Sequence, residues 1–314
     1  MKIFAGVNSI YFAEKICKNL NISLGKSTRK DFSDGEFKSK FNETVRGENV
    51  YIVQSTSQPD SNLFELLQMA DAAKRCGAKN IVAVIPYLGY CRQDKKDDPR
   101  TPITSAMIAK MVEASGINHL VTMDLHNDSI DGFYNIPVSH IYSSSVLIPY
   151  IKENFGDMNF MVVAPDLGAS KKTKVFSQKL STDMAICYKY RERDNEIKEM
   201  RLIGDVKGRN VLVVDDIGDT VNTLSECAKL LIKNGANKVY SAIAHPVLSG
   251  KAYATLGNSE IKELIVTNSI PVEPIDTTPE GWKGFSKISV LDVSKLFANV
   301  IRNIEDGKSI SQNL

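Results

Sequence analysis

Apolar runs of strand length alternate along this chain with segments of helical period. The runs that predict strands are residues 50–54, 81–86, 119–125, 160–164, 211–214, 239–244 and 263–267. Between them lie segments whose apolar residues recur every three or four positions, such as 63–76, 104–114 and 224–234. This alternation is typical of βαβ units, whose right-handed crossovers place helices on both faces of a parallel sheet. We therefore predict an α/β fold.

A short motif occurs in both halves of the chain. A helical segment, the sequence Gly-Ala-Lys-Asn at 77–80 and a strand are echoed by a helical segment, Gly-Ala-Asn-Lys at 235–238 and a strand. In each copy the glycine can end the helix. Chance similarity between two βαβ units would give the same echo. We interpret it as two similar domains, residues 1–145 and 146–291, with a C-terminal helix in 292–314 that packs back on the first.

Composition excludes several classes of protein. The 314 residues carry 39 Lys and Arg against 37 Asp and Glu, so charge gives no argument for a nucleic-acid partner. No apolar run approaches the roughly 20 residues that cross a bilayer, so we expect no membrane partner. The N-terminus reads as a first strand and not as a signal peptide. Five scattered cysteines without a Cys-x-x-Cys pair favour a reducing compartment, and we expect a cytoplasmic protein.

The segment 211–223 carries the most chemical information. It reads Val-Leu-Val-Val-Asp-Asp-Ile-Gly-Asp-Thr-Val-Asn-Thr, so an apolar strand ends in Asp215 and Asp216 just before a helix. Ligands of parallel sheets lie beyond the carboxyl ends of the strands, and a helix N-terminus suits a phosphate. The two acids suit ribose hydroxyls, a cation or both. A single Asp that caps a helix is the simpler alternative, but it leaves the other acids unexplained.

A charged segment follows the strand at 81–86. Residues 90–102 alternate cations with acids and contain two prolines, which excludes a core segment and is ordinarily explained by a solvated loop. Yet Arg92, Lys95, Lys96 and Arg100 follow a strand end, where they can clamp a polyphosphate. Arginine in particular suits bidentate contacts with phosphate.

Two further strand ends carry acids. Asp124 and His126 are two positions apart, so their side chains point the same way in an extended chain. They allow a metal site, an acid–base pair or a structural histidine. Asp166 opens the turn after the strand at 160–164, where it is either a helix N-cap or a ligand of Mg²⁺.

Two polar segments complete the candidates. Residues 188–194 are highly charged and lack periodicity, which predicts a surface loop. A mobile cationic loop is also what closes over a phosphoryl-transfer site. Asp34-Gly35 is an ordinary turn signal, while Phe32 beside Asp34 and Glu36 can instead stack a purine and accept hydrogen bonds from its amine.

Taken together, these motifs resemble one family. The order of segments 32–36, 92–96, 124–126, 189–191, 215–223, 245–250 and 267–270 is similar to that of the ribose-phosphate diphosphokinases, also called phosphoribosyl-diphosphate synthases. The resemblance covers essentially the whole chain. Phosphoribosyltransferases share only the segment at 215–223.

The resemblance implies two domains with the phosphoribosyltransferase-like fold and an Mg²⁺-dependent enzyme of nucleotide biosynthesis. The enzyme transfers the diphosphoryl group of ATP to the 1-hydroxyl of ribose 5-phosphate, leaving AMP. The implied ATP contacts, partly from a neighbouring subunit, are Phe32, Asp34, Glu36, Arg92, Gln93, Asp97 and Arg100. The implied ribose 5-phosphate contacts are Asp215, Asp216, Asp219, Thr220, Val221, Asn222 and Thr223. The implied metal ligands are His126, Asp166 and Asp124, and Lys189 and Arg191 stabilise the migrating group.

Regulation also follows only from the resemblance. It implies a homo-oligomer, a hexamer, with inorganic phosphate and ADP as effectors. The implied regulatory phosphate site comprises Thr44, Arg46, Ser309 and Ser311.

Some positions depart from the family pattern. Asn222 stands where the family usually has Gly, and Asn is the next best residue for a positive φ. Lys172 stands where Arg is common, and Asn135 and Ser139 stand where Asp is common. Two alternatives stay open: a phosphoribosyltransferase, and a non-catalytic regulatory homologue of the synthase.

Overall fold

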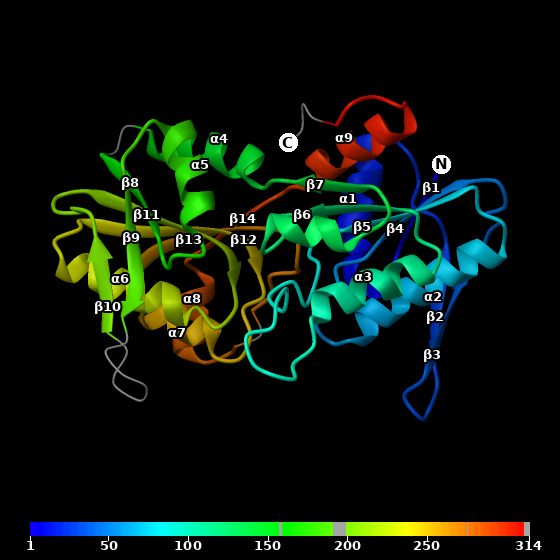
Figure 1. Cartoon of the computed structure of the whole chain (residues 1–314), viewed down its shortest axis with the longest axis horizontal. Coiled ribbons are helices and arrows are strands. Elements are labelled where there is room, and N and C mark those ends of the chain that lie inside the picture. Colours follow the sequence, from blue (N-terminus) through cyan, green and yellow to red (C-terminus); the bar gives the residue numbers. More distant parts are fainter. Residues whose placement is uncertain (157–158, 191–198, 275, 311–314) are drawn as a thin grey trace. The chain divides into compact units, whose positions relative to one another are not determined.

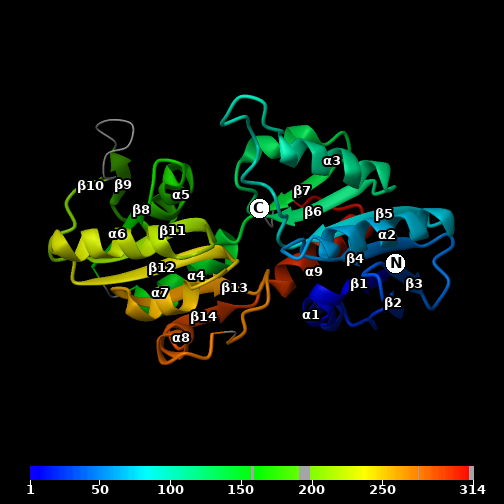
Figure 2. The same cartoon turned by 90° about the horizontal axis from the view of Figure 1, so that it is seen from below.

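The chain divides into two compact units. Unit 1 comprises Met1–Tyr142 and Asp292–Leu314, and unit 2 comprises Ser143–Leu291. A computed structural model describes residues 1–156, 159–190, 199–274 and 276–310; of residues 189, 190 and 199 it describes only the backbone. Figures 1 and 2 show the elements of both units in the colours of the sequence.

Unit 1 is built on a parallel sheet. In spatial order its strands are β1 (Lys2–Ala5), β4 (Asn49–Val53), β5 (Asn80–Ile85), β6 (His119–Met123) and β7 (Val138–Ile141). All neighbouring pairs are parallel. Its strands consist largely of buried apolar residues, as expected where helices cover both faces. A separate antiparallel hairpin pairs β2 (Ser27–Asp31) with β3 (Phe37–Phe41).

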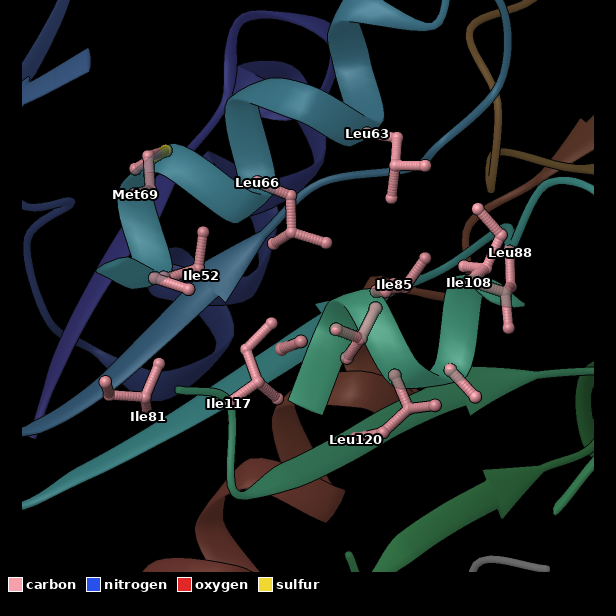
Figure 3. Packing of buried hydrophobic residues seen from close by; sticks show 14 of the residues in the cluster. Ile52, Leu63, Leu66, Met69, Ile81, Ile85, Leu88, Ile108, Ile117 and Leu120 are labelled. Atoms are coloured by element: carbon pink, nitrogen blue, oxygen red, sulfur yellow. The ribbon is translucent and has the colours of Figure 1, made fainter. Parts of the chain in front are cut away.

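One face of this sheet is covered by α2 (Ser61–Arg75) and α3 (Thr104–Ala114). Figure 3 shows the apolar side chains of both helices over those of the strands, among them Leu66 and Ile108 near Ile52 and Ile85. Truncating one such fully buried side chain to alanine typically costs about 2–5 kcal/mol, so this layer contributes a large share of the stability of unit 1.

The other face is covered by α1 (Ile10–Leu20) and α9 (Ser294–Glu305), which lie side by side in Figure 1. The rings of Phe12 and Phe297 meet edge to face, with centroids 5.3 Å apart. Tyr51 donates its hydroxyl to Glu305 Oε1 at 2.8 Å, and the Asn49 amide donates to the same oxygen at 2.9 Å. The last helix of the chain is therefore part of unit 1.

Unit 2 has a larger sheet. In spatial order its strands are β10 (Glu199–Ile203), β9 (Met184–Tyr190), β8 (Phe160–Ala164), β11 (Asn210–Gly218), β12 (Lys238–Pro246), β13 (Ile261–Thr267) and β14 (Ile288–Leu291). Only the edge strand β10 is antiparallel to its neighbour among these described pairs.

Helices cover both faces of this sheet as well. α4 (Ser144–Phe155) and α5 (Ser170–Leu180) pack in one apolar cluster, and α6 (Asn222–Lys233) and α7 (Ala252–Asn258) pack in another. α8 (Pro279–Phe285) approaches α7 closely because Gly284 has no side chain; a Cβ there would lie 1.8 Å from the carbonyl oxygen of Tyr253.

The predicted fold class is confirmed: both units are parallel α/β layers with helices on both faces. The helix predicted at 104–114 has those bounds, whereas the strand predicted at 119–125 ends at Met123. Within the described residues, no helix combines the length and the apolar character needed to span a bilayer.

Candidate active site

The segment expected to bind ribose 5-phosphate follows a central strand of unit 2. β11 lies between β8 and β12, and its buried residues 211–214 lead to the half-buried Asp215 and Asp216. The strand continues to Gly218, and α6 begins at Asn222, so residues 219–221 form the whole connection. Because the first N–H groups of a helix have no intrahelical partners, this turn presents backbone donors close to two carboxylates.

The positive φ in this turn is not at the residue that the sequence suggested. Asn222 is already helical, and Val221 has φ +63° instead. The expectation for Asn222 is therefore wrong. A β-branched residue in this region is strained, and the turn tolerates it because the Val221 side chain is buried in the core under α6. Val221 also has no side-chain oxygen with which to cap the helix.

A second loop supports the turn. The N–H groups of Leu248 and Ser249 donate to the carbonyl oxygens of Gly218 and Asp219, at 2.9 and 3.1 Å. The Ser249 hydroxyl donates to the carboxylate of Asp219. Because that carboxylate is engaged and negatively charged, Asp219 suits a phosphate through its backbone N–H and not through its side chain.

The acids at this edge of the sheet repel one another. Burial raises the pKa of Asp215 well above its ordinary value, the neighbouring charge of Asp216 raises it further, and Asp166 adds to the effect. The Asp216 N–H donates to Asp215 Oδ1 at 2.8 Å and offsets part of this repulsion. Asp166 follows the adjacent strand β8 and accepts a hydrogen bond from the Ala169 N–H at 3.0 Å. The carboxyl edge of unit 2 therefore has a negative electrostatic potential.

The structure describes only part of the segment that is expected to stabilise the transferred diphosphoryl group. Lys189 is the penultimate residue of β9, and its backbone pairs with that of Met200 in β10. Arg191 lies outside the described residues. Their role stays a prediction.

In unit 1, Phe32, Asp34 and Glu36 lie at the tip of the hairpin β2–β3, and all three are exposed. Asp34 Oδ1 accepts the Glu36 N–H at 3.0 Å, which closes the tip. The Phe32 ring is 42% exposed, with the ammonium groups of Lys30 and Lys38 at 5.7 and 6.0 Å from its centre. A flat partner such as a purine base would stack on this ring by displacing one of these ammonium groups.

The hairpin is fixed to α2 by side chains that the motifs did not indicate. Gln68 of α2 accepts a hydrogen bond from the Ser39 N–H at 3.0 Å and donates one to the Phe37 carbonyl at 2.9 Å. Its side chain thus makes the hydrogen bonds to β3 that the backbone of a neighbouring strand would make. Arg29 of β2 stacks on the Phe37 ring at 3.8 Å and lies 3.7 Å from the buried carboxylate of Glu65. These contacts join residues that are distant in sequence, and no local signal predicts them.

The charged segment after β5 is an exposed loop. Arg92, Gln93, Asp97 and Arg100 are all exposed. Gln93 Oε1 accepts a hydrogen bond from the Thr104 hydroxyl at 2.6 Å. The backbone carbonyl of Gln93 accepts one from the Ser105 N–H at 3.1 Å. The Gln93 side chain therefore anchors the loop to the start of α3.

The extended geometry expected for Asp124 and His126 is wrong. β6 ends at Met123, and Asp124 has φ +43°, so the chain turns there. Asp124 is buried, whereas His126 is exposed. The Leu125 N–H donates to His140 Nε2 at 3.0 Å, which holds this turn on β7 and fixes the proton of a neutral His140 on Nδ1.

No three His, Cys, Asp or Glu side chains in the described part of the chain form a group that could hold a metal ion. Asp124 and His126 belong to unit 1, and Asp166 belongs to unit 2. The proposed set of three ligands stays a prediction.

An apolar groove of about 450 Å³ lies in unit 1, lined mainly by side chains of α2 and α3. Phe64, Met107 and Met111 are its exposed apolar members. The groove contains none of the residues expected to bind ATP, and its lining does not suit a polyphosphate.

Comparison with known proteins identifies the family. Residues 1–116 match the N-terminal domain of ribose phosphate pyrophosphokinase, and residues 192–314 match the phosphoribosyl synthetase-associated domain. The ribose-phosphate pyrophosphokinases of Porphyromonas gingivalis and Helicobacter hepaticus are each 44% identical to this chain; the alignments cover 98% and 99% of the chain and 96% and 97% of the relatives. The crystal structure of phosphoribosylpyrophosphate synthetase from Mycobacterium smegmatis matches with a TM-score of 0.91 and 34% identity, over 98% of this chain and 99% of that one.

The chain belongs to the ribose-phosphate pyrophosphokinase family. The resemblance found in the motifs is therefore confirmed, and so is the enzyme class. The match extends along almost the whole chain, which disfavours a phosphoribosyltransferase, whose likeness was limited to one loop.

Of the residues expected to form a regulatory site, the described ones, Thr44, Arg46 and Ser309, belong to unit 1. Thr44 Oγ1 accepts a hydrogen bond from the Arg46 N–H at 3.4 Å. Ser309 lies beyond the end of α9, and its carbonyl accepts a hydrogen bond from the Asn303 side-chain amide at 3.1 Å. Ser311 lies outside the described residues. A regulatory phosphate site stays a prediction.

Proposed function

We propose that this enzyme transfers the β,γ-diphosphoryl group of ATP to the 1-hydroxyl of ribose 5-phosphate. The hydroxyl oxygen attacks the β-phosphorus, the bond between that phosphorus and the α-phosphate oxygen breaks, AMP leaves, and the hydroxyl proton is released. The observation that carries the proposal is the pair of acids in the last part of β11, followed by the short connection to the N-terminus of α6, in a chain of this family.

Ribose 5-phosphate binds at the carboxyl edge of unit 2 in this proposal. Asp215 and Asp216 accept hydrogen bonds from two ribose hydroxyls. These hydrogen bonds stabilise the charged form of Asp215, which burial and the neighbouring Asp216 disfavour. The 5-phosphate binds the backbone N–H groups of residues 219–223 and the hydroxyls of Thr220 and Thr223.

ATP binds residues of unit 1. Arg92 and Arg100 contact its phosphates, together with Gln93 and Asp97 in the same exposed loop. The exposed hairpin tip supplies Phe32 for stacking on adenine, and Asp34 and Glu36 for its amine. We propose that this tip serves the ATP site of another copy of the chain in a homohexamer.

Mg²⁺ fits the acidic character of the proposed site. The raised pKa of Asp215 supports a need for positive charge near the carboxyl edge of unit 2, and carboxylate oxygens are ligands that Mg²⁺ accepts. Asp166, Asp124 and His126 would hold the ion, which when bound neutralises charge on the diphosphoryl oxygens. Lys189 and Arg191 add fixed positive charge, which matters most as the group migrates.

Localisation and regulation complete the proposal. The free cysteines suit a reducing compartment, so we place the enzyme in the cytoplasm. Inorganic phosphate activates the homo-oligomer through Thr44, Arg46, Ser309 and Ser311, and ADP is a second effector. Activity that is constant across a wide range of phosphate concentration would contradict this.

The test is a product assay with ATP, ribose 5-phosphate and Mg²⁺. Formation of AMP and phosphoribosyl diphosphate in equal amounts supports the proposal. Diphosphate released from phosphoribosyl diphosphate and a base, without AMP formation from ATP, would instead assign a phosphoribosyltransferase. A chain inactive in both assays that raises the activity of a related synthase would be a regulatory homologue.

A further inference from the structure

Two cysteines from different elements of unit 2 face each other in its core. Cys187 in β9 and Cys227 in α6 are both completely buried. The Cys227 thiol donates a hydrogen bond to Cys187, with the two sulfurs 3.2 Å apart. Both belong to the apolar cluster under α6. The pair joins positions 40 residues apart in the chain, so a bond between them would link two separate elements.

We propose that Cys187 and Cys227 form an oxidation site, at which a hydroperoxide converts the thiol pair into a disulfide that ties β9 to α6. The sulfurs of a disulfide lie about 2.05 Å apart, so the two sulfurs must approach by only about 1 Å. A shift of that size is within reach of side-chain rotation and a small displacement of one element.

The hydrogen bond makes the two thiols unequal. Donation from Cys227 lowers the pKa of Cys187, and the same bond raises the pKa of Cys227. Cys187 is therefore the attacking thiolate, because the thiolate is the reactive form of cysteine.

The reaction balances without any further reagent. Cys187 loses its proton, its thiolate attacks one oxygen of hydrogen peroxide, and the O–O bond breaks. A sulfenic acid forms, and the departing hydroxide takes up that proton and leaves as water. The Cys227 sulfur then attacks the sulfenic sulfur, the S–O bond breaks, and a second water leaves. The two thiols lose two electrons and two protons in total, and the peroxide gains both.

Access to the pair depends on local opening of the sheet edge. β9 has one strand beyond it in the described sheet, the five-residue β10, in which Leu202 pairs with Cys187. Release of an edge strand costs less than global unfolding, so a small peroxide reaches the thiols at a rate set by this opening. The exposed Cys76 of unit 1 needs no such step and provides an internal reference.

The disulfide would connect two segments that the proposed function uses, and this part of the inference rests on that function. Lys189 is two residues beyond Cys187 in β9, and α6 begins at Asn222, within the proposed phosphate-binding segment 219–223. Pulling the two sulfurs together displaces one segment against the other. Oxidation therefore lowers the rate of AMP formation, and reduction by a dithiol restores it.

The first test measures the bond itself. The reduced full-length enzyme is treated with hydrogen peroxide, unreacted thiols are blocked, and peptides are mapped by mass spectrometry without reduction. We expect a Cys187–Cys227 cross-linked peptide lighter by two hydrogens than the sum of its parts. Complete oxidation of Cys76 with no such cross-link in the wild-type enzyme would overturn the oxidation site.

The second test measures activity. The wild-type enzyme should lose at least half of its AMP formation on oxidation and regain it with dithiothreitol, whereas Cys187→Ala and Cys227→Ala should not show this reversible loss. Cys17→Ala, which removes a buried cysteine of unit 1, is the matched control and should respond as the wild type does.

The two readouts separate the proposals. A cross-link with unchanged activity would overturn the link to catalysis and leave the oxidation site standing. A reduced wild-type enzyme that forms no AMP would overturn the proposed function, while the cross-linked peptide would still decide the oxidation site.

Discussion

Val221 provides a sharp test of the turn that leads into α6. At φ +63° a side chain costs about 1–2 kcal/mol relative to its ordinary backbone region. Glycine avoids that backbone cost. It also lacks the methyl group of alanine, whose burial stabilises the alanine variant by about 0.8 kcal/mol. Glycine also loses about 0.5–1 kcal/mol because its unfolded chain is more flexible. The three contributions nearly cancel, so Val221→Gly and Val221→Ala should differ by less than about 0.5 kcal/mol. At an ordinary helical position, by contrast, alanine is more stable by about 1 kcal/mol.

The assay is urea unfolding followed by circular dichroism, with both variants measured in the same buffer without substrates. Lys229, exposed in the middle of α6, supplies the control pair: Lys229→Ala should be more stable than Lys229→Gly. If Val221→Ala proves more stable than Val221→Gly by about 1 kcal/mol, as at Lys229, the left-handed conformation at Val221 is refuted.

Further predictions concern charge and positioning. Lys189→Ala should lower kcat by about two orders of magnitude; an unchanged kcat removes Lys189 from the mechanism. Because the raised pKa of Asp215 makes the folded state bind its proton more tightly, unfolding free energy should fall as pH rises above the ordinary carboxyl range. Asp215→Asn should flatten that fall and raise the melting temperature at neutral pH while abolishing activity; a lower melting temperature contradicts the repulsion. Gln68→Ala should raise KM for ATP about fivefold with little change in kcat, unlike the exposed control Gln178→Ala.

Elements with a strong apolar pattern could be predicted from the sequence. The continuous apolar runs became the central strands β8, β11, β12 and β13, since such runs suit only strands buried on both faces. The short edge strand β14 was missed: its residues Ile288–Leu291 are mostly half-buried, so its pattern is weak. β7 was also missed, because four residues give too little pattern to distinguish a strand from a loop.

The site was predictable where chemistry and order coincide in a local motif. The Asp215 turn joins a strand, two acids and a helix within thirteen residues, and the structure has that order. Contacts made across the fold gave no such signal. Ser249 supports Asp219, and Gln68 holds the hairpin, at separations of about 30 residues that only tertiary packing brings together. The turn at Asp124 was missed because a left-handed Asp has no distinguishing sequence pattern.

The return of α9 to unit 1 has a consequence for biosynthesis. A ribosome synthesises all of unit 2, from Ser143 to Leu291, before it makes the helix that covers the second face of the first sheet. Until α9 emerges, Phe12 of α1 lacks the Phe297 ring that packs against it in the finished fold. Unit 1 therefore completes its core only at the end of synthesis, and its incomplete form exposes apolar surface that favours aggregation and chaperone binding.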